Sequence, residues 1–288
     1  MVNYKATLRY DGTKFFGFQT QKGPRILTIQ DGIQSVLSKI FNNPVKIFVA
    51  GRTDTGVHAT GQVINFKVER EMSPKRLQIA LNGLLDRAIS VSDVAIVDPD
   101  FHAGHNAKCR KYLYILDNSP NPDALKRNRA YWHPYRLDIE SMKEAIKQFE
   151  GEHDFSRFAK GNREVEKARR KIISTEIRTS EDFDSFKLKG EHTGQNSFKS
   201  DKLQKENSGI ISAIKDITIL SNHLIFFHFK GLSFLHSMVR LMVGNLIEVG
   251  KGKLSPDDIG RMLIPDYSVI SHASKVPGMG LYLVGVEY

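Results

Sequence analysis

Residues 45–68 read VKIFVAGRTDTGVHATGQVINFKV and decide the fold class. The runs 45–50 and 62–68 are rich in the β-branched and aromatic residues that favour strands. Residues 51–58 between them carry too many Gly and Thr residues for a helix. Two strands joined by a loop break the strict strand–helix–strand order of a parallel sheet. The stretch therefore favours an α+β fold with a mainly antiparallel sheet.

The rest of the chain mixes the two periodicities in the same way. Alternation of apolar and polar residues over 4–10 predicts an opening strand, and further strands are expected at 89–97, 111–117, 171–178, 185–189, 224–229 and 281–286. Helical spacing of apolar residues, with a capping residue before several of the runs, predicts helices that begin after Thr28, at Ser73-Pro74, at 139, near Phe234 and at Ser255-Pro256. The second half shows a similar mixture of expected strands and helices to the first, which indicates two similar halves.

Composition shifts place the expected boundaries. We predict an N-terminal half over 1–118, a linker over 119–137 and a C-terminal half over 138–288. Residues 191–209 hold almost no apolar side chain, which is typical of a mobile surface insertion.

The charge balance indicates the partner. The 288 residues contain 42 Lys+Arg against 32 Asp+Glu, a net charge of +10, so the protein attracts polyanions and nucleic acid is the expected partner. A membrane partner is not expected, because no apolar run approaches the ~18 residues of a spanning helix. The start of the chain does not resemble a secretion signal, and the single Cys109 forms no internal disulfide, which suits a cytoplasmic protein. The ten histidines show no spacing typical of a metal site.

Asp54 is the candidate reactive group of the loop at 51–59. Arg52 beside it favours the ionised carboxylate. The alternative is a structural turn aspartate that caps backbone N–H groups, which is the commoner use of an Asp-Thr-Gly sequence.

The wider sequence supports the reactive role, because the loop sequence Gly51-Arg52-Thr53-Asp54-Thr55-Gly56-Val57-His58-Ala59 resembles the signature of TruA-type tRNA pseudouridine synthases. Other motifs of that family recur in order down the chain: Tyr10-Asp11-Gly12-Thr13 with Gly17 and Gln19, Thr28-Ile29-Gln30, Phe101-His102-Ala103, Arg110-Lys111-Tyr112-Leu113-Tyr114, Gly151-Glu152-His153-Asp154-Phe155, Phe234-Leu235-His236-Ser237-Met238-Val239-Arg240 with Gly244, and Gly280-Leu281-Tyr282. Phe18 departs from the family tryptophan, and the stretch 191–209 is the main departure.

The resemblance implies a fold, a reaction and an assembly. The expected fold is two α/β halves packed around a mainly antiparallel central sheet with a catalytic cleft between them. The expected reaction detaches uracil from its ribose and rejoins it through C5 without cofactor or metal. The usual targets are positions 38–40 of the tRNA anticodon arm, and the expected assembly is a homodimer.

The resemblance also implies the catalytic residues. Asp54 matches the family nucleophile, which attacks either C1′ of the ribose or C6 of the base, and Arg240 matches the arginine that pairs with it. Tyr112 matches the tyrosine that packs on the base and assists proton removal. The alternative for Arg240 is a helix arginine that extends to solvent, and Tyr112 and Tyr114, which share one strand parity, can instead form a structural aromatic pair.

Arg52, His58 and Tyr114 are the candidate substrate contacts. The resemblance implies that Arg52 fills the space of a flipped base, although an ion pair with Asp54 or a phosphate explains it equally. His58, four residues after Asp54, is a candidate RNA contact, and a hydrogen-bonded loop histidine is the commoner alternative. A basic interval over 160–171 adds a candidate phosphate contact, or a solvated surface.

Three functions agree with the basic charge and the motifs. The first is a tRNA pseudouridine synthase acting on the anticodon stem-loop, and the second is a related synthase with different tRNA sites. The third is a non-catalytic RNA-binding or chaperone protein. Such a protein has no need of an anion among phosphates, so the Asp54 loop favours the enzyme.

Overall fold

The structure is a computed structural model that describes residues 1–288 except 22, 24–26, 161–164, 183–222 and 266–273. The chain forms two compact units, Met1–Lys111 with Tyr282–Tyr288 (unit 1) and Tyr112–Leu281 (unit 2). Residues 112–118 of the predicted N-terminal half and the predicted linker 119–137 lie in unit 2. The expected insertion at 191–209 and the expected strand at 185–189 lie outside the described residues.

Unit 1 is a sheet in the order β4-β1-β3-β10, formed by β1 (Val2–Tyr10), β3 (His58–Val68), β4 (Ile89–Val97) and β10 (Leu281–Glu287). β1 lies antiparallel to both β3 and β4, and β10 lies parallel to the start of β3. The short β2 (Ile47–Val49) pairs antiparallel with the later part of β3. The residues 51–57 thus form a loop between two paired strands, as the sequence predicted.

Two helices accompany this sheet, and their ends follow from the sequence. In α1 (Ile29–Phe41) Thr28 accepts a hydrogen bond from the Asp31 backbone, which confirms the predicted cap. α2 (Pro74–Leu84) begins with proline as predicted, but Ser73 makes no side-chain capping bond. The helices bury one apolar face each, which α1 builds from Ile29, Ile33, Val36 and Leu37.

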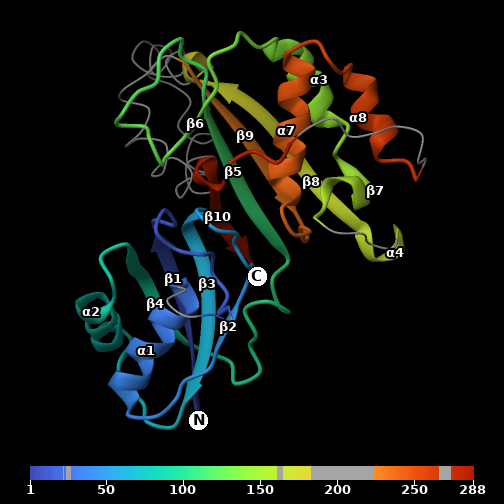
Figure 1. Ribbon diagram of the computed structural model, residues 1–288. Helices are drawn as coiled ribbons and strands as arrows, with labels where there is room; N and C mark the ends of the chain where they lie inside the picture. Colours follow the sequence, from blue (N-terminus) through green and yellow to red (C-terminus); the bar gives the residue numbers. More distant parts are fainter. Residues whose placement is uncertain (22, 24–26, 161–164, 183–222, 266–273) are drawn as a thin grey trace, which may run out of the picture. The chain divides into compact units, whose positions relative to one another are not determined.

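Unit 2 carries a sheet in the order β5-β9-β8-β7, formed by β5 (Cys109–Asp117), β9 (Leu224–Gly231), β8 (Arg169–Thr179) and β7 (Gly151–Asp154). β8 lies antiparallel to β7 and β9, and β6 (Tyr131–Trp132) pairs with the end of β5. The helices among the described residues of this unit are α3 (Ile139–Lys147), α4 (Val165–Ala168), α7 (Met238–Gly250) and α8 (Pro256–Met262) (Figure 1). The predicted α+β class with a mainly antiparallel sheet is confirmed.

Two element starts differ from the prediction by four residues, more than the others. The helix expected near Phe234 begins at Met238, because Ser237 adopts a left-handed backbone with φ of 62° that a helix does not contain. The strand expected from 62 begins at His58, because Tyr10 and Tyr282 pair with its first residues and extend it. In both cases tertiary packing overrides the local pattern.

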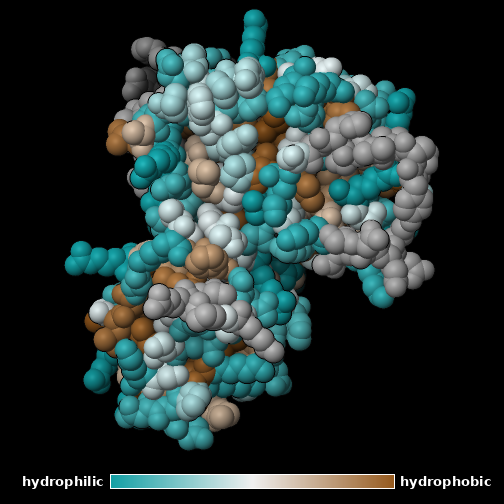
Figure 2. All heavy atoms as spheres, viewed as in Figure 1, coloured by the Kyte–Doolittle hydropathy of each residue, from teal (hydrophilic) through white to brown (hydrophobic). Residues whose placement is uncertain are grey.

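Polar and apolar side chains both reach the surface of the described residues. Figure 2 shows mostly hydrophilic residues on the visible face of the molecule, with brown patches between them. On α2 the side chains of Ile79 and Leu84 are 61% and 55% exposed. Among the described residues no helix is long and apolar enough to cross a membrane.

Candidate active site

The loop that carries Asp54 is fixed by backbone hydrogen bonds on both sides. The Thr53 carbonyl accepts from the Phe18 N–H at 3.0 Å, and the Gly56 N–H donates to the Phe15 carbonyl at 3.3 Å. Within the loop Val57 N–H donates to the Asp54 carbonyl at 3.2 Å, which closes a tight turn. Gly56 in this turn has a φ of 75°, a conformation that favours glycine. Asp54 itself is half-buried.

Buried polar side chains support the loop from below. The Tyr10 hydroxyl lies 2.8 Å from Thr53 Oγ1, and Gln62 Nε2 donates to the Gly51 carbonyl at 2.6 Å and to the Tyr10 hydroxyl at 3.3 Å. Burial raises the pKa of Tyr10 to about 12, so its phenol is neutral near pH 7. These contacts hold Gly51 and Thr53, two of the three loop residues that precede Asp54.

The motif at residues 10–19, here called the opening motif, contains two glycines that pack against the loop. A Cβ atom on Gly12 would lie 2.0 Å from the Val57 carbonyl oxygen. A Cβ on Gly17, whose φ is 89°, would lie 2.8 Å from the Thr53 carbonyl oxygen. Any side chain at these positions displaces the loop, so glycine is required for the close approach.

His58 lies inside unit 1, with 1% of its surface exposed. Its Nδ1 accepts a hydrogen bond from the Gly12 N–H at 3.0 Å, and its ring stacks on Tyr282 with centroids 4.7 Å apart. These contacts correspond to the alternative that the sequence left open, a hydrogen-bonded loop histidine. They join the opening motif, the loop and the last strand.

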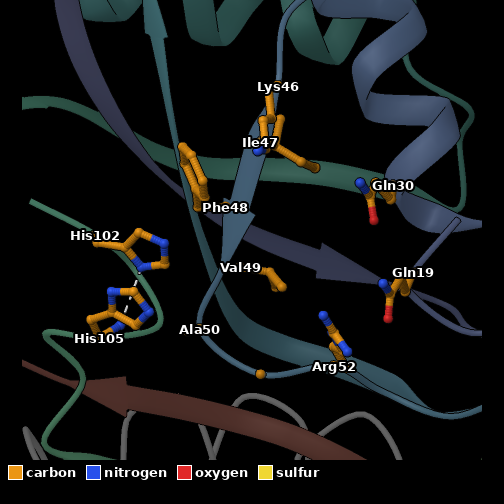
Figure 3. A pocket seen from close by; sticks show the side chains of 11 residues that line it. Gln19, Gln30, Lys46, Ile47, Phe48, Val49, Ala50, Arg52, His102 and His105 are labelled. Carbon is orange, nitrogen blue, oxygen red and sulfur yellow. Dashed lines mark hydrogen bonds between the residues drawn. The ribbon is translucent and has the colours of Figure 1, made fainter.

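Arg52 is exposed and lines a cavity of about 490 Å³ beside β2 (Figure 3). Its side chain points toward the same space as those of Gln19 and Gln30. Arg52 and Asp54 therefore lie in the loop 51–57 and His58 begins β3, with Arg52 exposed and His58 buried.

The other candidate residues belong to unit 2. Tyr112 is 8% exposed and meets the Phe234 ring edge-to-face at 4.9 Å. Tyr114 is fully buried, donates its hydroxyl hydrogen to the Pro277 carbonyl at 3.0 Å and packs edge-to-face with Phe227. Burial raises the pKa of Tyr114 well above its ordinary value. These contacts give Tyr114 a structural role.

Arg240 lies on α7 with 9% of its surface exposed, so it does not extend to solvent as the alternative reading required. Its Nε donates to the Val276 carbonyl at 2.7 Å. Tyr114 bonds the next carbonyl, that of Pro277, so one short segment ties β5 to α7. The guanidinium also lies close enough to Tyr114 for its charge to oppose the rise of the Tyr114 pKa.

Comparison with known proteins assigns the family. The family model described as tRNA pseudouridine synthase matches residues 6–106 and 145–288. A tRNA pseudouridine synthase A of Pseudothermotoga lettingae is 36% identical over the whole of both chains. Proteins of the same name from a Geobacillus species and from Listeria monocytogenes are 34% and 33% identical, with at least 97% of each chain covered. The chain belongs to the tRNA pseudouridine synthase family. The family match includes the loop of Asp54 and the helix of Arg240.

Three residues to which the sequence assigned no role contact the loop or the residue before it. Gln62, Tyr10 and Arg110 each bond to the loop or to its entry: Arg110 donates from Nε and Nη2 to the Ala50 carbonyl at 3.1 and 2.8 Å. Tyr10 and Arg110 lie in two of the family-like motifs, but only their contacts show that they hold Thr53 and Ala50. For Gln62 the signal was a polar residue at a buried position of an apolar strand.

Basic side chains are exposed in one segment of the chain, and in another a buried lysine forms an ion pair. In the interval 160–171 the side chains of Lys160, Lys167, Arg169 and Lys171 are exposed, while Arg163 lies outside the described residues. In the irregular segment before β6, by contrast, Lys126 is 5% exposed and pairs with Asp117 at 3.1 Å. Among the described residues no group of three or more His, Cys, Asp and Glu side chains is arranged to hold a metal ion.

Proposed function

We propose that the protein converts uridine to pseudouridine in the anticodon stem-loop of tRNA, at positions 38–40, with Asp54 as the nucleophile. The observation that carries the proposal is the loop itself: it lies within the family match, and hydrogen bonds from three separate segments fix it. A carboxylate that must attack one atom of a substrate needs a rigid support of this kind.

The other residues serve the same reaction in this proposal. A uridine stacked in a stem must leave the helix to reach Asp54, at a cost of a few kcal/mol. Arg52, exposed beside Asp54, occupies the space that the base leaves. Arg240 pairs with the carboxylate, and Tyr112 packs on the uracil and assists removal of the C5 proton. The anchoring of Arg240 to Val276 and the packing of Tyr112 on Phe234 support these roles, because both limit side-chain motion.

The test compares the native protein with Asp54→Ala on a set of uridine-containing tRNA transcripts. Pseudouridine is mapped by chemical modification, and tRNA affinity is measured alongside. We expect product at positions 38–40 from the native protein, and from Asp54→Ala normal binding without product. Asp93→Ala, which removes an exposed aspartate of β4, is the matched control and keeps full activity.

Each contrary result points to one alternative. Product from Asp54→Ala overturns the assignment of the nucleophile. Product at other tRNA positions favours the related synthase, and tRNA binding without any product favours the non-catalytic RNA-binding protein.

We also propose a cytoplasmic homodimer. The exposed apolar side chains of Ile79 and Leu84 on α2 support a protein contact, since such side chains gain from burial. Light scattering tests the assembly: a mass near twice the 32.6 kDa of one chain is expected, and a mass of one chain refutes it.

A further inference from the structure

The cavity beside β2, here called the β2 pocket, has two chemically different walls. Figure 3 shows Phe48, His102 and His105 on one side of β2 and Gln19, Gln30 and Arg52 on the other. Its volume of about 490 Å³ is in the range of small-ligand sites. The pocket includes Gly51 and Arg52, so it is continuous with the loop of Asp54.

The aromatic wall is a short ladder of three rings, two of them stacked and the third tilted by 49°. The His102 and His105 rings stack with centroids 3.8 Å apart and an angle of 8°, and the Phe48 ring lies 4.7 Å from His102. Lys46 Nζ lies 5.3 Å above the Phe48 ring. His105 is exposed, so the ladder ends in an imidazole that solvent reaches.

Hydrogen bonds within residues 102–106 hold this ladder in place. His102 Nδ1 accepts from the Gly104 and His105 N–H groups at 3.1 and 3.2 Å, and Asn106 Oδ1 accepts from the His102 N–H at 2.7 Å. Arg110 Nη2 donates to the Gly104 and Ala50 carbonyls at 2.8 Å each, which ties residues 102–106 to the residue that follows β2. Burial, together with the neighbouring His105, lowers the pKa of His102, which favours its neutral form in the stack.

The chemistry of the walls selects the ligand. A flat imidazole offers a stacking face to a base of any identity, and side-chain amides can bond base edges. The cations of Lys46 and Arg52 suit a phosphate. A metal ion is the other ligand that two histidines suggest, but Nδ1 of His102 is engaged by backbone N–H groups, and in the described part of the chain no third ligand joins the pair.

We propose that the β2 pocket binds an unpaired nucleotide that flanks the target uridine of the RNA. Its base stacks on the exposed face of His105, and its phosphate lies near Lys46. The proposal rests on the proposed function, because Arg52 lies two residues before Asp54 and thereby links the two positions. The pocket would then fix the RNA next to the uridine that reacts.

The test measures the affinity of the full-length protein for a labelled tRNA transcript by fluorescence anisotropy at several salt concentrations. His105→Ala removes the stacking face but keeps the backbone N–H that bonds to His102, so the loop stays folded. We expect Kd to rise at least about fivefold, the lower end of the cost of removing a stacking side chain. His105→Phe restores a flat face and returns Kd to within about twofold of the native value.

Lys46→Gln tests the phosphate contact and has a matched control. We expect the slope of log K against log salt to fall by about one, as for the loss of one phosphate contact. Lys39→Gln makes the same charge change at an exposed lysine of α1 that does not line the pocket, and its Kd should equal that of the native protein.

The proposal is overturned if His105→Ala binds like the native protein, if His105→Phe fails to restore binding, or if the two lysine variants are indistinguishable. Pseudouridine formation by the native protein is assayed in the same samples. Binding that depends on His105 without any product overturns the proposed function and leaves the pocket assignment standing. Product from the native protein together with an unchanged Kd in His105→Ala overturns the pocket assignment and leaves the proposed function standing. Absence of RNA binding by the native protein overturns both.

Discussion

The hydrogen bond between Tyr10 and Thr53 gives the sharpest test of how the loop of Asp54 is held. Both side chains are buried, and their oxygen atoms lie 2.8 Å apart. Tyr10→Phe and Thr53→Val each delete one hydroxyl with little change of shape. Each single variant leaves the other hydroxyl without this partner in a buried site.

The expected energies follow from this arrangement. Each single substitution should cost about 1–2 kcal/mol of opening free energy, the usual loss for a buried neutral hydrogen bond. The double variant should cost about 1 kcal/mol less than the sum, because the second deletion removes a group whose partner is already gone. Thr53 directly precedes Asp54, so Tyr10→Phe should also lower the single-turnover rate on the order of tenfold, given that a misplacement of about 1 Å can cost a hundredfold.

Amide hydrogen exchange of β1 and β3 is the appropriate stability assay, because it reports on unit 1 alone and a chain with two units need not unfold in one step. Tyr4→Phe is the matched control. The Tyr4 hydroxyl, on the same strand, bonds the Met72 backbone far from the loop, so its loss should destabilise β1 and leave turnover unchanged. Additive energies, or an equal loss of turnover in Tyr4→Phe, would refute the proposed support of Asp54.

Two further substitutions test other contacts. Gly17→Ala should destabilise unit 1 by roughly 1–3 kcal/mol in the same exchange assay, because φ is 89° and the new methyl group meets the Thr53 carbonyl; native-like protection would contradict this. His228→Phe should remove a pH dependence, since burial lowers the pKa of His228 from 6.5 to about 4. The unfolded chain then binds the proton first, so the stability present above pH 6.5 is lost as the pH falls toward 4, by about 2 kcal/mol at pH 5. Urea unfolding at pH 8 and 5 should show this loss in the native protein and a smaller one in the variant, and equal losses would exclude His228 as the source.

Much of the fold could be read from local patterns. Caps and spacing located α1 after Thr28, and Ser255 forms the capping box that begins α8. The errors occurred where packing competes with periodicity. Phe234 and Leu235 continue the apolar pattern of α7 but belong to the irregular segment before it, because Phe234 packs on Tyr112 and Ser237 takes a left-handed backbone. The spacing of apolar residues along the chain contains no information about this ring contact or about the backbone of Ser237.

The candidate site divides in the same way. The sequence by itself determined that Asp54 lies in a strand-connecting loop with Arg52 beside it, since composition excludes a helix there and flanking β-branched residues specify the strands. Only the tertiary structure decided what fixes that loop. Tyr10 and Gln62 reach it from positions many residues away, and Gly17 must lack a side chain for the chains to approach. Hydrogen bonds and close contacts depend on distances in space, which sequence order leaves open until strands pair.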